Sequence, residues 1–147
     1  MKTARAAIDA TGTGVLLTGR AECFLVGHPD PLNESIRRLQ AYAEAGADVL
    51  YAPGPRTPED IKAIVDAVAP KPVNVLVGRN IGLKLSDLAE MGVRRVSVGS
   101  ALSLAAWGAF IRAAKALSEE GSFEGLDQMA SGADLNRLFH SDPRSRA

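Results

Sequence analysis

The stretch that decides the fold is residues 46–78, which read GADVLYAPGPRTPEDIKAIVDAVAPKPVNVLVG. Two short runs rich in β-branched residues, at 49–51 and 73–77, flank a longer segment of helical period. Thr57 is suited to cap this helix and Pro58 to open it. The apolar residues expected on the buried face of the helix are Ile61, Ile64, Val65 and Val68. A strand, a helix and a second strand in this order predict a βαβ unit with parallel strands.

The same alternation continues on both sides of this stretch. It predicts further strands at 15–18 and 93–98. Helices are expected at 3–10 and at 103–120. Between them we expect one helix that begins at Asp30 and Pro31 and ends at Gly46, and a short one that ends near Met91. The last helix should turn one stripe of side chains inward, namely Leu104, Trp107, Ile111, Ala114 and Leu117.

We therefore predict four β/α units at 1–121, followed by a helical segment at 122–140 and a frayed tail at 141–147, all in one domain. Four such units fit either an open doubly wound sheet or part of a barrel. A complete (β/α)8 barrel needs about 200 residues or more, so a chain of 147 residues can supply only part of one.

The composition narrows the class of partner. Lys and Arg together number 17, as do Asp and Glu, so the formal net charge is zero and neither nucleic acid nor membrane is an expected partner. The sequence holds a single cysteine, Cys23, which cannot form an internal disulfide and favours a cytoplasmic location. Hydrophobic residues make up 46% of the chain, enough for a core without disulfides or a structural metal.

Candidate site residues lie at the carboxyl ends of the predicted strands, where loops of parallel sheets converge. Arg20 and Glu22 follow the first strand and point the same way from an extended chain. Arg20 offers a planar fork for a carboxylate or phosphonate. The alternative is a structural ion pair that closes the top of the barrel. Tyr51, at the end of the second strand, is as well suited to packing as to binding.

Two further strand ends carry candidates. Asn74 is a polar amide in an apolar strand, so it must bond either to a ligand or to interior neighbours. Gly99 and Ser100 precede a helix and could bind a phosphate through backbone N–H groups, although Gly-Ser is also an ordinary helix cap. No residue is singled out as catalytic, and no local metal-binding motif occurs.

Several of these segments resemble one family. Residues 18–25, TGRAECFL, are similar to the Ala-Arg-Thr-Asp/Glu segment of the isocitrate lyase / phosphoenolpyruvate mutase superfamily. Segments that follow in the family's order are DPL at 30–32, RRL at 37–39, AYAEAGAD at 41–48, YAPG at 51–54, KPVNVL at 71–76 and GVRRVS at 92–97. The likeness runs from about Ala4 to about Leu138.

This resemblance implies the C-terminal half of a TIM-type barrel from a Mg2+-dependent lyase or mutase. Such enzymes make or break C–C or C–P bonds in small 2-oxo and dicarboxylic acids, so a small anionic acid is the implied substrate. Arg20 matches the arginine that grips the substrate's anionic group, and Glu22 the acidic residue beside it. Residues 123–139 resemble the family's C-terminal helix, which relatives exchange between subunits.

The sequence also departs from the family. Pro53 replaces the glutamate of the lyases, and Leu76 their asparagine, which counts against isocitrate or methylisocitrate cleavage. Mutase, phosphonopyruvate hydrolase, oxaloacetate decarboxylase and unassigned lyase activities stay open. The family's Mg2+ ligands and its mobile Lys-Lys-Cys-Gly-His loop belong to the first four β/α units, which this chain does not contain. We therefore expect a truncated enzyme that is inactive alone.

Two alternatives to an enzyme fragment remain. One is a non-enzymatic half-barrel that forms a homo-oligomer or complements a separate N-terminal half, because an open half-barrel exposes sheet edges and an apolar face. The other is a phosphate-binding α/β domain that uses Gly99 and Ser100.

Overall fold

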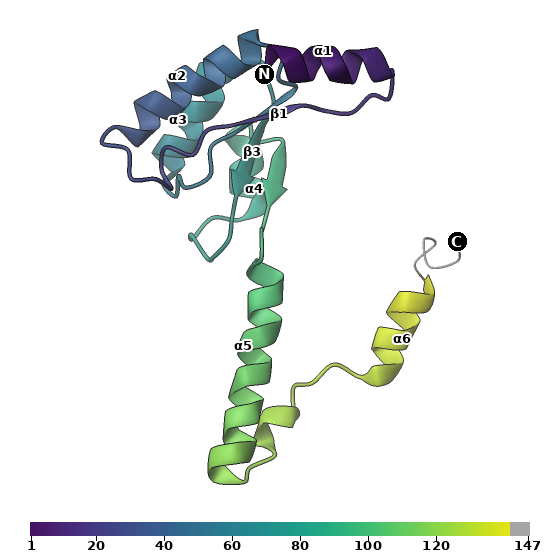
Figure 1. Cartoon of the computed structure of the whole chain (residues 1–147). Helices are drawn as coiled ribbons and strands as arrows, with labels where there is room; N and C mark the ends of the chain where they lie inside the picture. The colour runs from purple at the N-terminus through teal and green to yellow at the C-terminus, as the bar shows by residue number, and fades with distance from the viewer. Residues whose placement is uncertain (142–147) are drawn as a thin grey trace. The chain divides into compact units, whose positions relative to one another are not determined.

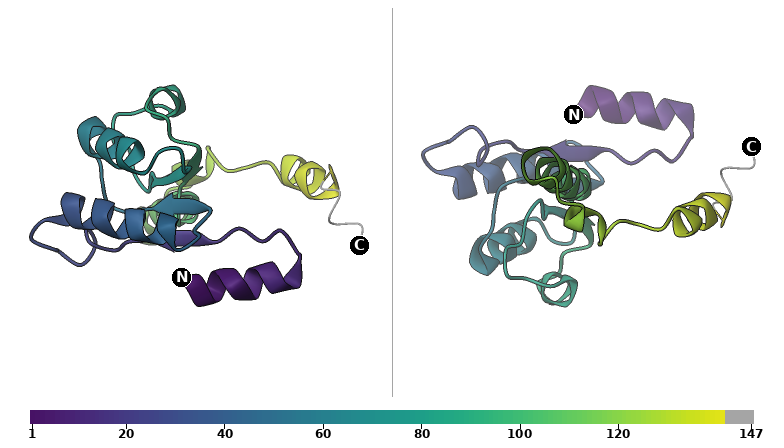
Figure 2. Two further views of the ribbon diagram at one scale, coloured as in Figure 1. Left: turned by 90° about the horizontal axis from the view of Figure 1, so that it is seen from above. Right: turned by 90° about the horizontal axis from the view of Figure 1, so that it is seen from below.

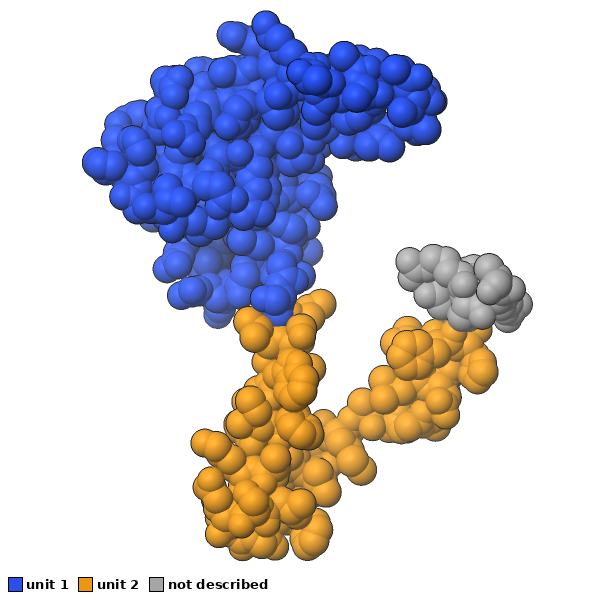
Figure 3. All heavy atoms as spheres, in the orientation of Figure 1, with its two compact units in different colours: residues 1–101 blue, residues 102–147 orange. Residues whose placement is uncertain are grey.

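The computed structural model describes residues 1–141 (Figure 1). The chain divides into two compact units, residues 1–101 and residues 102 onward (Figure 3). From residue 142 on, the predicted frayed tail lies outside the described residues.

The first unit is built on a four-stranded parallel sheet. Its strands are β1 (Thr18–Arg20), β2 (Val49–Tyr51), β3 (Val73–Leu76) and β4 (Arg95–Ser97). They lie in the order β1-β2-β3-β4. A doubly wound sheet reverses its strand order at one point, whereas barrel strands follow one another in sequence. The observed order confirms the α/β class and favours the barrel type of architecture.

Four helices accompany the sheet. They are α1 (Lys2–Thr11), α2 (Pro31–Glu44), α3 (Pro58–Val68) and α4 (Leu85–Glu90). Asp30 and Thr57 cap α2 and α3 as predicted: the Asp30 carboxylate accepts from Asn33 N at 3.4 Å, and Thr57 Oγ1 accepts from Asp60 N at 3.2 Å. Figure 2 shows α2 and α3 side by side, and they pack against each other.

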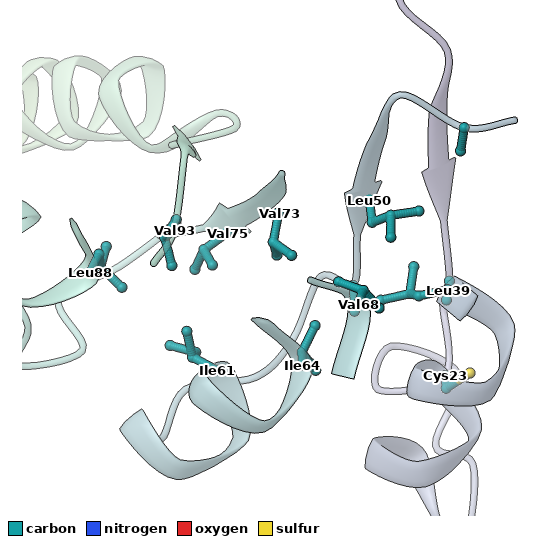
Figure 4. Close-up of a cluster of buried hydrophobic side chains, with 13 residues drawn as sticks. Cys23, Leu39, Leu50, Ile61, Ile64, Val68, Val73, Val75, Leu88 and Val93 are labelled. Carbon is teal, nitrogen blue, oxygen red and sulfur yellow. The ribbon is translucent and has the colours of Figure 1, made fainter. Parts of the chain in front are cut away.

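The core lies between the sheet and helices α2, α3 and α4 (Figure 4). Its apolar side chains include Leu39 from α2, Leu50 from β2, Ile61 and Ile64 from α3, Val73 and Val75 from β3, and Leu88 from α4. Complete burial of one such side chain contributes about 1.5–3 kcal/mol. A close approach of helix to strand requires Gly19, because a Cβ there would lie 2.8 Å from Cβ of Tyr42.

The strand at 15–18 was predicted three residues too early. Val15 and Leu16 are 54% and 68% exposed, and β1 begins only at Thr18. The reason is pairing, since Thr18 is the first residue in register with β2, opposite Val49. The strands β3 and β4 are likewise shorter than the predicted strands at 73–77 and 93–98. The ladder between them joins only Asn74–Leu76 to Arg95–Ser97.

The second unit is helical. It contains α5 (Ala101–Lys115), which begins at the last residue of the first unit, the π-helical turn η1 (Ala116–Glu120), the 3-10 turn η2 (Glu124–Leu126) and α6 (Gly132–Ser141). The predicted helix at 103–120 is therefore present.

Within the second unit, the stripe predicted to face inward from that helix is not covered. No residue of α5 is buried, and Leu104, Trp107 and Ile111 are 64%, 57% and 50% exposed. Ala114 and Leu117 are exposed as well. Periodicity identifies an apolar face but not what covers it. Across residues 1–141, no helix combines the length and hydropathy that crossing a bilayer requires.

Candidate functional site

Arg20 and Glu22 form an ion pair where β1 ends. Arg20 Nε lies 2.6 Å from Glu22 Oε1, and each side chain is 47% exposed. The intervening Ala21 is 1% exposed and points into the core, while its N–H donates to Tyr51 O at 2.9 Å. This alternation points both charged side chains the same way, as predicted, and away from the core. The structural ion pair is thus present, and the binding role of Arg20 and Glu22 remains a prediction.

Tyr51 lies beneath the Arg20 guanidinium. Cζ of Arg20 is 5.0 Å from the centroid of the Tyr51 ring. The two residues are opposite each other in the β1–β2 ladder, and Tyr51 is opposite Asn74 in the next one. Residues in register on neighbouring parallel strands share a face of the sheet. Three adjacent strands therefore place an arginine, a tyrosine and an asparagine on one face, opposite the core.

Asn74 bonds to an interior neighbour. The residue is 1% exposed, and its Nδ2 donates to Ser97 Oγ at 3.0 Å. Its Oδ1 is buried and has no hydrogen-bond partner among the described residues. The interior alternative for Asn74 thus accounts for its donor but not for its acceptor. Ser97 was not predicted as part of this face; a parallel pairing of β4 with β3 would have identified it.

The turn at Gly99 and Ser100 stands apart from these residues. Gly99 has a left-handed φ of 54°, and the N–H of Ala101 already donates to Val98 O at 3.0 Å. Because that amide is engaged, fewer N–H groups are left for a phosphate. Within residues 1–141, no hydrogen bond or ion pair joins this turn to Arg20 or Asn74. Phosphate binding here remains a prediction.

The residues present do not fit a magnesium site. Across residues 1–141, no three His, Cys, Asp or Glu side chains gather into a group that could hold a metal ion. Glu22, the carboxylate at the end of β1, is already paired with a cation. Magnesium in proteins usually takes one or two carboxylates together with waters and substrate oxygens.

Asp48 fixes the opposite end of the first two strands. Its Oδ2 accepts from Leu17 N at 2.7 Å and lies 2.7 Å from Nη1 of Arg5 on α1. The hydrogen bond from Leu17 and the charge of Arg5 lower the pKa of the Asp48 carboxyl. Asp48 thereby connects α1, the approach to β1 and the start of β2, and so sets the position of the strand that carries Arg20.

Comparison with known proteins gives a consistent result. The family described as phosphoenolpyruvate phosphomutase matches residues 1–118. An uncharacterised protein of Mycobacterium tuberculosis is 32% identical over 113 residues, which cover 77% of this chain and 43% of that protein.

Solved structures agree with this match. A Burkholderia cenocepacia protein named as a lyase/mutase superposes with a TM-score of 0.88 and 45% identity, over 96% of this chain and 50% of its own. Oxaloacetate acetylhydrolase in complex with its product oxalate superposes with a TM-score of 0.75 and 25% identity, over 95% of this chain and 47% of its own. The chain thus spans about half the length of these relatives.

Proposed function

The chain belongs to the phosphoenolpyruvate phosphomutase family, within the superfamily that includes isocitrate lyase, and from this we propose that its Arg20 face is the substrate-binding wall of a lyase or mutase for small 2-oxo or dicarboxylic acids. The observation that carries the proposal is Arg20 itself. Its side chain lies at the carboxyl end of a barrel-type strand and is 47% exposed, with Nε 2.6 Å from Glu22 Oε1. Ligand sites of such barrels lie at this end.

Arg20 supplies binding and orientation in this proposal. Its remaining N–H groups can hold a carboxylate or phosphonate in two parallel hydrogen bonds. The oxaloacetate acetylhydrolase structure supports a small diacid as ligand class, since that related protein holds oxalate. Glu22 fixes the side of the guanidinium that faces away from the ligand.

The Mg2+ that the family implies would have to be held by residues that this chain does not contribute. When bound, such an ion stabilises negative charge developing on a substrate oxygen. We therefore propose that the 147-residue chain binds the acid but does not turn it over alone.

Binding is tested by calorimetric titration of the chain with oxalate. We expect saturable binding that weakens at least about tenfold in Arg20→Gln, because a charged, bidentate partner is lost. Arg37→Gln is the matched control, since Arg37 lies on α2 and pairs with Glu34, and it should bind as the wild type does. Equal affinity of wild type and Arg20→Gln would contradict the proposed site.

Turnover is tested separately, with oxaloacetate and phosphonopyruvate in the presence of Mg2+. We expect no product from the pure chain. Mg2+-dependent turnover that Arg20→Gln abolishes would show that the chain holds a complete active site, contrary to the proposal.

A second candidate function is a half-barrel that associates with another chain. Strands β1 and β4 are the edges of the four-stranded sheet, and edge strands present unpaired backbone groups. The partner would be a second copy or an N-terminal half-barrel of the same family. Mixing the chain with a separately expressed N-terminal half from a family member, followed by gel filtration, distinguishes a mixed complex from a homo-oligomer.

A further inference from the structure

We infer that Tyr51 is a positioning residue, which holds the Arg20 guanidinium so that its terminal Nη edge faces the bound acid group. This inference rests on the proposed function, in which Arg20 binds that group. It adds a residue whose sequence position alone suggested packing as readily as binding.

The first observation is the stacking distance. The Arg20 Cζ lies 5.0 Å from the Tyr51 ring centroid, within the range of about 6 Å over which a cation is attracted to an aromatic face. Tyr51 itself is half-buried, and its backbone is paired in register with Arg20. Its O accepts the hydrogen bond from Ala21 N. The ring is therefore attached to a well-fixed strand and provides a stable platform.

The second observation is the orientation of the guanidinium edges. Glu22 Oε1 lies 2.6 Å from Nε, so the Nε side is occupied. A guanidinium carries five N–H donors, of which four belong to Nη1 and Nη2. Within residues 1–141, neither of these two nitrogens donates a hydrogen bond to another residue. With the Tyr51 ring beneath Cζ and Glu22 beside Nε, the edge left for a ligand is the one formed by Nη1 and Nη2.

This geometry selects a chemical class of ligand. Two parallel N–H donors on one edge match the two oxygens of a carboxylate, or two oxygens of a phosphonate. An arginine that is already ordered loses less rotamer freedom when it binds. Tyr51 would thus increase affinity for small acids without touching them.

The experiment compares Tyr51→Phe, which keeps the ring, with Tyr51→Leu, which removes it. Oxalate is the probe, and affinity is measured by calorimetry. We expect Tyr51→Phe to bind within about twofold of wild type and Tyr51→Leu to bind about three- to tenfold more weakly, the range expected of one cation–π contact. Tyr51→Met is a second ring-free variant in case the leucine variant does not fold.

A second readout needs no ligand. In wild type, the Arg20 δ-methylene protons should be shifted upfield by the ring, and the 15N relaxation of Arg20 Nε should report an ordered side chain. Tyr51→Phe should preserve both signatures, and Tyr51→Leu should lose both.

The two readouts separate the two ideas. If wild type does not bind oxalate, the proposed function fails, while the Arg20 signals still decide whether Tyr51 orders the guanidinium. If Tyr51→Leu binds oxalate as tightly as wild type, or if wild-type Arg20 shows neither the upfield shift nor the order, the positioning role is overturned.

Discussion

Asn74 on β3 and Ser97 on β4 are joined by a side-chain hydrogen bond, from Asn74 Nδ2 to Ser97 Oγ, at 3.0 Å. The two residues lie on neighbouring strands, on the face that also carries Tyr51. The acceptor atom of the same amide, Oδ1, is buried and unpaired among the described residues. Because only one of its two polar atoms is bonded, substitutions of this pair can test what the Asn74 amide contributes to stability.

Replacing Ser97 and replacing Asn74 should change the free energy of unfolding by different amounts. Ser97→Ala leaves Nδ2 buried without an acceptor, which should lower the free energy of unfolding by about 1–3 kcal/mol. Asn74→Leu removes both polar atoms at similar volume, so the free energy of unfolding should change by less than about 1 kcal/mol. Urea unfolding followed by circular dichroism measures both. A larger loss in Asn74→Leu than in Ser97→Ala would show that the amide makes a bond beyond Ser97.

Gly54 should not tolerate a side chain. Its φ is 122°, and a Cβ there would lie 2.3 Å from Cβ of Phe24. We expect Gly54→Ala to lower the free energy of unfolding by about 2–4 kcal/mol through backbone strain and overlap. Gly78→Ala is the control, because a Cβ at Gly78 meets nothing within 4 Å. Equal stability of the two variants in thermal melts would contradict this account.

Glu34, on α2, should make the thermal stability of the protein depend on pH. Bonds from Arg37 and Arg38 lower its pKa to about 2, from 4.5. A carboxyl whose pKa is depressed in the folded state stabilises above its unfolded pKa, and this stabilisation is lost as the pH falls through the folded pKa. Thermal melts of wild type and Glu34→Gln should therefore differ at pH 6 and converge as the pH approaches about 2.

The control for this measurement is Glu44→Gln, at the other end of α2, where no ion pair is formed among the described residues. At pH 6, Glu44→Gln should change the melting temperature less than Glu34→Gln does, because it breaks no ion pair. A Glu34→Gln variant that remains as different from wild type at pH 2 as at pH 6 would rule out the titration as the cause.

The exposed aromatic pair of α5 should report self-association. Trp107 and Phe110 are 57% and 61% exposed, and their rings meet edge to face at 5.4 Å. Exposed apolar patches of this kind mark interaction surfaces. We expect the single tryptophan fluorescence to shift to shorter wavelength as the protein concentration rises, and light scattering to show an oligomer at micromolar concentration. Trp107 emission independent of concentration, with a monomer mass, would contradict this expectation.

Helix ends in the first unit could be predicted from sequence because their causes are local. Asp30 and Thr57 accept bonds from N–H groups three residues away, and Gly46 adopts a φ of 92° just after α2. Strand ends could not be predicted as well, because they depend on a partner strand. Thr18 rather than Val15 begins β1, since Thr18 is the first residue that lies opposite a residue of β2.

In the candidate site, too, local features could be predicted from the sequence and features that depend on strand pairing could not. The common direction of Arg20 and Glu22 follows from the alternation within one strand, and the sequence alone predicts it. The stacking of Arg20 on Tyr51 and the bond from Asn74 to Ser97 depend on the register of strands that lie 31 and 23 residues apart. Register of this kind is decided by tertiary packing, which the strand sequences do not encode by themselves.

The sequential strand order has a consequence for how the first unit acquires its structure. Each strand pairs only with the strand that precedes or follows it in the chain, and α2 and α3 pack on the strands next to them in sequence. Contacts between neighbouring β/α units close smaller loops than contacts between the two ends of the unit would, and a smaller mean sequence separation of contacts goes with faster folding. Folding kinetics of residues 1–101 should accordingly be governed by the docking of one β/α unit on its neighbour.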